Sequence, residues 1–414
     1  MAQSFAPAAN PPRTPTVNTV FRSPINTVSG RIIADVSDEI PFYEPSAAPL
    51  TAFMLGIKKM KKATQRKFEH FEKDPYPATA TVASAALAGA TTVNVSAGQG
   101  DRFRANDLVI HKPSGQVFLV SSVSTDALTV VADPSAQGTN AFAAGDELEI
   151  IGSTFDDGAD IGALRSTRET NIYNYLEIVR HAFGWSRRQA TSDMYGGSDP
   201  DLEIKAQGIE HKKQIEKLLF FGVRFNRTGS TSHEQTGTGG LNYFVSTNKW
   251  NLANTEPTER QLVEALEYGM RWGKNSNVGG GGSKILYASR RWMTFFDKLG
   301  RDRIHYTDMG ELLGRGRIGL KVGEFHTVHG MLTLVSHPMF TGSHAGLAFL
   351  VDPAELTVRY HQGGNGFGDG RTKLLEGRQG NGVDGEYLEY QSDIGLQVSL
   401  EAAHMKWENL QLSV

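Results

Sequence analysis

The clearest pattern along the chain is an alternation of apolar and polar residues in short runs between residues 78 and 151. A period of two predicts strands with one buried face. Glycine, asparagine, aspartate and proline separate the runs, as in turns. The pattern therefore predicts a small all-β barrel or sandwich, inserted as an independent domain into a host domain. Its expected strands are residues 91–95, 107–111, 116–123, 127–131 and 147–151.

The longest element that the sequence predicts is a helix from Asp199 to residue 221. Asp199 offers an N-cap, Pro200 suits the first helical position, and Gly222 provides a C-terminal stop. Its length would be about 30 Å. One face would carry Ile204, Gly208, Ile215, Leu218 and Leu219. The solvated remainder would carry Glu203, Lys205, Glu210, Lys212, Lys213, Glu216 and Lys217.

The rest of the chain mixes strands and helices, which predicts an α+β fold. Thr258 and Gln261 form a capping-box pattern that opens a helix ending at Gly273. Ser289 caps a short helix whose aromatic residues 292, 295 and 296 favour a core face over a stacking platform. Strands are expected at residues 171–186, 284–288, 332–335 and 347–351, and almost continuously over 385–410.

The first 48 residues and the basic run after them show no such regularity. Seven prolines in residues 1–48 oppose helix and central strand, so we expect an extended arm that orders against a neighbour. The basic run has two interpretations: contact with phosphates or with an acidic patch on a neighbouring subunit, or a solvated strand edge where lysine blocks unwanted pairing. Residues 66–71 alternate as an exposed strand does. The run comprises Lys58, Lys59, Lys61, Lys62, Arg66 and Lys67.

Composition changes the picture mainly by exclusion. The 414 residues carry a net charge of −3, which argues against a dedicated reader of nucleic acid. No cysteine is present, which excludes disulfides, thiolate metal sites and cysteine nucleophiles. No apolar run reaches the roughly 18 residues of a membrane span, and the first residues lack the layout of a signal peptide.

The motifs that carry chemistry elsewhere lack their structural context here. The glycines of residues 314–319 and 364–370 do not link a strand to a helix, as a phosphate-binding loop must. Residues 279–284 lack the Gly-Lys-Ser/Thr order of a P-loop. His326 and His329, three apart in a strand-like segment, would face opposite sides. The sequence therefore predicts no catalytic, cofactor-binding or metal-ligating residue, no cofactor and no enzyme.

The order of these parts resembles the major capsid proteins of tailed bacteriophages with the Hong-Kong-97-type fold. Residues 49–60 (PLTAFMLGIKKM) resemble the start of the extended loop in a subfamily with an inserted β domain. Residues 174–192 and 201–219 resemble its strand and acid-rich helix, and residues 322–339 (VGEFHTVHGMLTLVSHPM) its axial hairpin. Residues 347–359 and 393–410 resemble the two segments that close the chain.

The resemblance implies a division of the chain into the regions of that fold. These are the N-terminal arm (1–48), the first part of the extended loop (49–77), the inserted β domain (78–151), the loop's return with a strand of the peripheral domain (152–195), the spine helix and peripheral domain (196–256), the axial domain (257–350) and the return strands to the peripheral domain (351–414).

The resemblance also implies a structural function. The protein would assemble from many copies, as pentamers and hexamers, into an icosahedral head around double-stranded DNA, which it would touch non-specifically. Scaffolding, portal and decoration proteins would be further partners, with no membrane. It would be synthesised and assembled in the host bacterial cytoplasm and reside in the virion. Contacts between subunits would involve Lys58, Lys59, Lys61, Lys62, Arg66, Lys67, Arg187 and Arg188.

Other functions remain open at this point. An encapsulin-type cellular shell protein would share the fold, and a cargo-binding partner would distinguish it. A β-rich virion decoration or adhesion protein would be built around residues 78–151, and glycan binding by that module alone would favour it. An enzyme would reveal itself by saturable activity on a small molecule.

Overall fold

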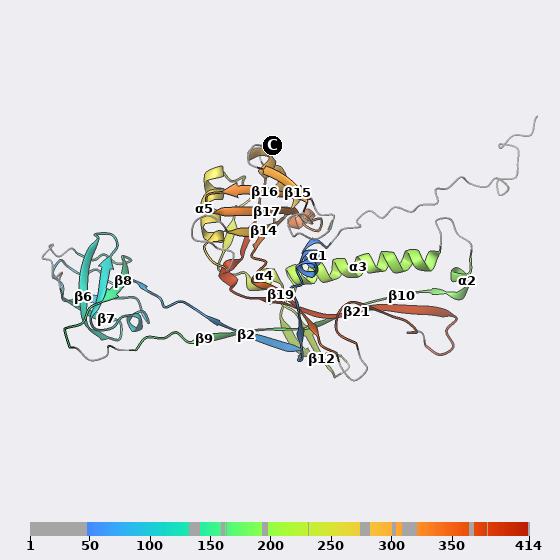
Figure 1. Cartoon of the computed structure of the whole chain (residues 1–414), viewed down its shortest axis with the longest axis horizontal. Helices are drawn as coiled ribbons and strands as arrows, with labels where there is room; N and C mark the ends of the chain where they lie inside the picture. The colour runs from blue at the N-terminus through green and yellow to red at the C-terminus, as the bar shows by residue number, and fades with distance from the viewer. Residues whose placement is uncertain are drawn as a thin grey trace, which may run out of the picture.

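The computed structural model describes residues 48–131, 141–158, 162, 164–192, 198–230, 232–273, 282–299, 304–308, 321–363, 368–378 and 380–412, with only the backbone for 304–308, 321 and 322. The predicted α+β class is confirmed, with strands dominating. The molecule is elongated (Figure 1), and among the described residues no helix is long and apolar enough to cross a membrane. The predicted arm, except residue 48, and most of the glycine-rich stretches (279–281, 314–319 and 364–367) lie outside the described residues.

A five-stranded sheet forms a platform under the longest helix, α3 (Asp199–Phe221). Its two longest strands run antiparallel over ten residue pairs, from Glu177↔Ile394 to Ser186↔Gly385. The hydroxyl of Tyr390 donates to the carbonyl oxygen of Ile204 in α3, at 3.1 Å, which ties the helix to the sheet. The strand order is β1 (Met60–Ala63), β19 (Leu356–His361), β21 (Gly385–Val398) and β10 (Glu177–Ser186), and β20 (Lys373–Leu375) also pairs with β21.

Helix α3 has the predicted length, but two details of the prediction are wrong. Ser198 is the N-cap, and Asp199 instead lies in the first turn, where its charge favours the positive end of the helix dipole. Glu216 was assigned to the solvated face, yet its side chain is fully buried. The helix ends as predicted at Gly222, whose N–H donates to the carbonyl oxygen of Leu218.

A seven-stranded sheet stands above the end of the platform nearest the ribbon (Figure 1). The predicted capping box opens α5 (Glu259–Met270), and α6 (Arg290–Leu299) begins after Ser289 as expected. The aromatic side chains of α6 are buried, and Trp292 packs 4.9 Å from Trp407 between ring centroids. The strand order is β13 (Lys249–Asn251), β22 (Met405–Glu408), β18 (Ala348–Val351), β14 (Ser283–Ala288), β17 (Gly330–Ser336), β16 (Lys321–Thr327) and β15 (Ile304–Asp308).

A six-stranded antiparallel sheet lies at one end of the molecule and has its own hydrophobic core. All five strands expected in this region are present to within two residues, and one short strand, β3, was not expected. That this sheet is an insertion into a host domain stays a prediction. The order is β3 (Thr79–Thr81), β8 (Glu147–Ser153), β5 (Asp107–His111), β6 (Gln116–Ser124), β7 (Ala127–Val131) and β4 (Thr92–Asn94), with a 3-10 turn at Gly100–Arg102.

A two-stranded ribbon joins this sheet to the platform (Figure 1). It pairs β2 (Lys67–Lys73) with β9 (Glu169–Tyr175) over seven residue pairs. The prediction of one strand over residues 171–186 is therefore wrong, because the chain leaves the ribbon at Leu176 and enters β10 of the platform. Leu176 is buried, and its N–H donates to the carbonyl oxygen of Arg66 at 2.7 Å, which closes the ribbon's root.

The prediction of an almost continuous strand over residues 385–410 also needs correction. Strand β21 ends at Val398, and the chain turns at Leu400, whose φ is +47°, into a 3-10 turn at Glu401–Ala403. It then enters the seven-stranded sheet as β22. A uniform run of strand-forming residues cannot indicate where a chain passes from one sheet to another. Here one such segment supplies a strand to each of two sheets.

The main core lies where the platform, α3 and the seven-stranded sheet meet. Helix α1 (Pro49–Gly56), which the sequence did not predict, contributes Leu50, Phe53 and Met54 to it. The remaining short elements are α2 (Arg187–Ala190), β11 (Phe225–Thr228), β12 (Glu234–Gly237), α4 (Leu241–Phe244) and a 3-10 turn at Gly342–His344.

Candidate intersubunit surface

The first four lysines of the basic run lie at the edge of the platform, not on the ribbon. Lys58 has a φ of +57° and turns the chain from α1 towards β1. The ammonium of Lys59 donates to the carbonyl oxygen of Ala354 at 2.9 Å, so this charge is used within the chain. Lys61 and Lys62 are exposed on β1, the outer strand of its sheet. The strand-edge interpretation of the run therefore fits these two residues.

The last two basic residues of the run flank the ribbon's root and contact their own chain. Arg66 forms an ion pair with Glu234 of the β11–β12 hairpin. Lys67 pairs with Glu69, and its ammonium lies 4.4 Å from the centre of the Tyr173 ring. The hydrogen bond between the Lys67 ammonium and the Glu69 carboxylate raises the pKa of Lys67 and lowers the pKa of Glu69. These charges help to hold the ribbon's root in place.

Arg187 and Arg188 lie on α2, at the far end of the platform from the ribbon (Figure 1). Both are exposed, and the Arg187 guanidinium lies 2.9 Å from the Asp384 carboxylate. The structure therefore does not bring them together with the lysines, and their part in contacts between subunits stays a prediction. Strand β10 carries the chain past the ribbon before α2 begins.

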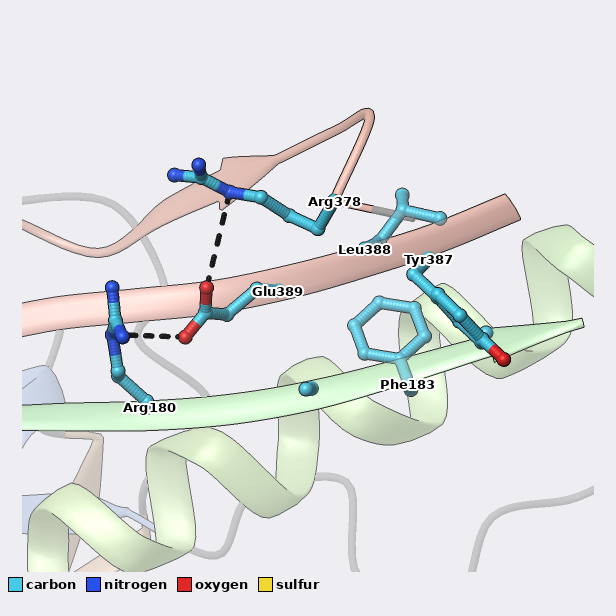
Figure 2. A pocket seen from close by; sticks show the side chains of 8 residues that line it. Arg180, Phe183, Arg378, Tyr387, Leu388 and Glu389 are labelled. Carbon is cyan, nitrogen blue, oxygen red and sulfur yellow. Dashed lines mark ion pairs between the residues drawn. The ribbon is translucent and has the colours of Figure 1, made fainter. Parts of the chain in front are cut away.

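Sequence reasoning missed a charged groove of about 620 Å³ on the platform (Figure 2). Glu389 lies 3.0 Å from Arg180 and 3.9 Å from Arg378. Because neighbouring strand residues face opposite sides and Tyr390 faces α3, Glu389 lies on the face away from the helix. The Tyr387 ring covers Gly184, where an added Cβ would lie 2.2 Å from a ring carbon. The available signal was the pair of small residues Ala182 and Gly184, which follow Arg180 on the same face of the strand.

A second groove, of about 560 Å³, lies beside the first and shares Arg378. Here Arg371 pairs with Asp369 and holds the pKa of that carboxyl below its ordinary value. Burial raises the pKa of Asp393 at the same groove. Acidic and basic side chains thus alternate over this part of the platform, which suits contact with another charged protein surface more than binding of one anion.

The ribbon itself presents apolar surface to solvent. Phe71 of β2 is 71% exposed, although it lies between Glu69 and Lys73 on a two-stranded element. Ile178, at the start of β10, is 58% exposed. Phe71 and Ile178 lie on different elements, so each is a separate candidate contact and the two do not form one apolar patch.

The six-stranded sheet contains a serine–histidine–aspartate arrangement that calls for a structural interpretation. His111 Nδ1 lies 2.6 Å from Ser114 Oγ, and its Nε2 lies 2.9 Å from Asp146 Oδ2. His111 is buried at the end of β5 against Phe142, and neither groove described above includes these residues. The hydrogen bonds tie the turn after β5 to the turn before β8. Among the described residues no group of acidic or histidine side chains could hold a metal ion.

Asn174 fixes the ribbon where it rejoins the platform. Its side-chain oxygen accepts from the backbone N–H groups of Tyr175 (2.9 Å) and Gly239 (2.8 Å). Its amide nitrogen lies 3.0 Å from Thr238 Oγ1 and 2.9 Å and 2.6 Å from the carbonyl oxygens of Gly239 and Leu396. The side chain is 2% exposed. One amide therefore links β9, the loop before α4 and β21.

Comparison with known proteins gives consistent matches. The sequence matches the family model described as SU10 major capsid protein over residues 14–411. The major capsid protein of Pseudomonas phage PaMx41 is 23% identical over 355 residues, which cover 82% of this chain and 83% of that protein. Among solved structures, the capsid of a native GTA particle has a TM-score of 0.48 at 8% identity and covers 95% of this chain and 100% of that chain. The capsid of Myoviridae phage XM1 has a TM-score of 0.45 at 11% identity, over 92% and 100%.

Proposed function

The chain belongs to the SU10 major capsid protein family and is a structural subunit of a phage capsid, and from this premise we propose how it contacts its neighbours. The resemblance to phage major capsid proteins is thereby confirmed. The α+β fold with one long helix over a sheet agrees with the Hong-Kong-97-type architecture that the resemblance implied. The family is one of structural proteins, so the activity to explain is assembly.

We propose that the β2–β9 ribbon, with the six-stranded sheet at its end, lies over an adjacent subunit. The observation that carries this proposal is the ribbon's position: it leaves the body of its own chain and exposes Phe71 (Figure 1). A two-stranded ribbon is marginally stable in water by itself. Contact with a neighbour would cover the exposed ring and stabilise the ribbon.

The platform would supply the complementary charged contacts. Lys61 and Lys62 on the outer strand, Arg187 and Arg188 on α2, and the groove around Glu389 are separate places on the same sheet. Complementary charges of this kind set register and orientation more than affinity. Lys58, Lys59, Arg66 and Lys67 would contribute less, because three of them already contact their own chain and Lys58 forms a turn.

Shell formation follows from many such contacts. Each subunit would be held by several neighbours in pentamers and hexamers, so weak contacts would sum to a stable closed shell. With a net charge of −3 the chain would touch packaged double-stranded DNA only non-specifically. Scaffolding, portal and decoration proteins would join the same assembly, which would take place in the host cytoplasm.

The charge contacts can be tested by reversing Lys61 and Lys62 to glutamate. Both side chains are exposed, so the free energy of unfolding of the dissociated subunit should change by less than about 1 kcal/mol, while the particle yield falls sharply. The control is the double change to arginine, which keeps both charges. Particle yields are measured by sedimentation and electron microscopy. An unchanged yield for the glutamate variant would remove these lysines from the interface.

The ribbon contact is tested separately by Phe71→Ser. A smaller, polar side chain at a 71%-exposed position leaves the fold intact and removes the apolar contact. We expect fewer or less stable particles, measured by resistance to dissociation in urea. The matched control is Val328→Ser, at a turn residue that is 89% exposed and far from the ribbon in the chain. Equal behaviour of the two variants would contradict a ribbon contact.

A further inference from the structure

Glu216 is the least expected side chain of the long helix. It is fully buried in the main core, between Ile215 and Phe220, at a position where sequence periodicity placed a solvated charge. A buried carboxylate is unfavourable unless hydrogen bonds replace its lost water. Its partners therefore indicate what the residue is for.

Four donors converge on this carboxylate. Oε1 accepts from the backbone N–H of Leu50 at 2.7 Å and from His337 Nε2 at 3.0 Å. Oε2 accepts from the backbone N–H of Thr51 at 2.9 Å and from the Thr51 hydroxyl. His337 Nδ1 accepts from the N–H of Met339, so Nε2 carries the proton that Glu216 receives. The set contains donors only, which suits an ionised carboxylate.

Three of these donors, two backbone N–H groups and the Thr51 hydroxyl, belong to the first turn of α1. The first N–H groups of any helix have no partner within the helix, and the residue before α1, Ala48, offers no side-chain cap. Glu216 supplies that cap from α3, and its negative charge lies at the positive end of the α1 dipole. The N-terminus of α1 is thus held by another helix.

The three elements that meet at Glu216 have different places in the molecule. Helix α1 leads through Lys58 directly into β1 and then into the ribbon. Helix α3 spans the platform, and His337 follows β17 of the seven-stranded sheet, with its N–H on the carbonyl oxygen of Ala288 at 2.8 Å. One carboxylate therefore links α1, which leads through β1 to the first strand of the ribbon, both to α3 on the platform and to the seven-stranded sheet.

We propose that Glu216 is a positioning residue for shell assembly, which fixes α1 and so the direction in which β1 and the ribbon leave the body. It does not itself touch a neighbouring subunit. The inference rests on the proposed function, because the ribbon's direction matters only if the ribbon contacts another copy. It adds a residue that lies inside the subunit, away from every candidate contact.

The test is Glu216→Gln in the full chain. Glutamine has the same shape, but one of the two acceptor oxygens is replaced by an NH₂ group. That NH₂ group would face donors of α1 or His337 and could not accept from them. Hydrogen exchange by mass spectrometry then compares a peptide covering residues 49–56 with peptides from β14 and β17. We expect α1 to exchange more than about tenfold faster, because hydrogen bonds to a charged group are lost, and the two strands to change little. The matched control is Glu210→Gln on the exposed side of α3, where Glu210 pairs with Lys213.

Particle formation is the second readout. With a released α1, we expect Glu216→Gln to give a lower yield and a broader particle size distribution, while Glu210→Gln gives normal particles. Unchanged exchange at α1, equal loss of protection in all peptides, or a released α1 with normal particles would each overturn the proposal. If the unaltered chain forms no particles, the proposed function fails, whatever the exchange shows.

A milder variant keeps the test decisive if Glu216→Gln does not fold. Thr51→Val removes one hydroxyl donor and leaves both backbone N–H bonds in place. It should speed exchange of residues 49–56 by about fivefold, the equivalent of one ordinary hydrogen bond, without affecting β14. No change there would contradict a carboxylate that holds α1.

Discussion

Replacing Asn174 by aspartate tests whether the ribbon's root is held as the hydrogen bonds indicate. The change is nearly isosteric. The oxygen that accepts from the N–H groups of Tyr175 and Gly239 is retained, while the amide nitrogen becomes a second oxygen. That oxygen would face the carbonyl oxygens of Gly239 and Leu396, at present 2.9 Å and 2.6 Å from the donor.

The magnitude follows from these contacts. The amide NH₂ has two hydrogens, so two donor bonds disappear, and the buried carbonyl groups of Gly239 and Leu396 lose this donor. At about 1 kcal/mol for each lost bond and 1–3 kcal/mol for each unsatisfied group, the free energy of unfolding should fall by about 4 kcal/mol or more at pH 7. Asn171→Asp on the same strand is the control, because the exposed Asn171 amide donates to Glu69 at the surface. Its effect should stay below about 1 kcal/mol.

Urea unfolding of the dissociated subunit, followed by tryptophan fluorescence, measures the difference, and pH supplies a second check. The new carboxyl at residue 174 would have a raised pKa in the folded state, because it is buried against oxygen atoms. Its protonated form can donate, so the variant should recover part of its deficit relative to the unaltered chain as pH falls towards 4, and lose it again as pH rises. A deficit below 1 kcal/mol at pH 7, or one that grows on acidification, would refute the reasoning.

Three further predictions concern buried groups. Burial lowers the pKa of Lys284 to about 8, although its ammonium donates to three carbonyl oxygens. The unfolded chain therefore binds more protons between about pH 8 and 10.5, and the free energy of unfolding should rise across that window by about 3 kcal/mol. Urea titration should show that Lys284→Met abolishes this rise and lowers the free energy of unfolding at pH 7 by about 3 kcal/mol. Burial also lowers the pKa of His211 to about 4, so stability should fall as pH drops from 6.5 to 4, and His211→Gln should flatten that slope. Phe103→Ala should destabilise the six-stranded sheet by about 3–5 kcal/mol and, in calorimetry, separate its unfolding from that of the platform; a single unshifted transition would count against an independent core.

Much of the fold could be predicted from the sequence, because the signals were local. The capping box at Thr258, the stop at Gly222 and the alternation in β5 and β7 depend on residues close together in the chain. Where the prediction failed, the deciding contact was distant. Leu176 and Leu400 interrupt strand-forming stretches because the chain changes sheets there, and no local residue pattern records the partner strand.

The candidate surface was less predictable for the same reason. In the sequence, Glu216 resembles any charged residue of a solvated helix. Its burial depends on contact with α1, which lies about 165 residues earlier in the chain. The groove around Glu389 needs two segments almost 200 residues apart, β10 and the stretch from Arg378 into β21. The basic run, by contrast, was visible in the sequence, but its division into internal and exposed charges was not.

The ribbon also has a mechanical consequence. Seven residue pairs span about 24 Å, so a tilt of about 10° at the root displaces the far end by about 4 Å, more than the length of a hydrogen bond. Any looseness at the root is thus amplified along the ribbon, and the six-stranded sheet at its tip magnifies it further. The hydrogen bonds of Leu176 and Asn174 lie at this root, so they limit how far the six-stranded sheet at the other end of the ribbon is displaced.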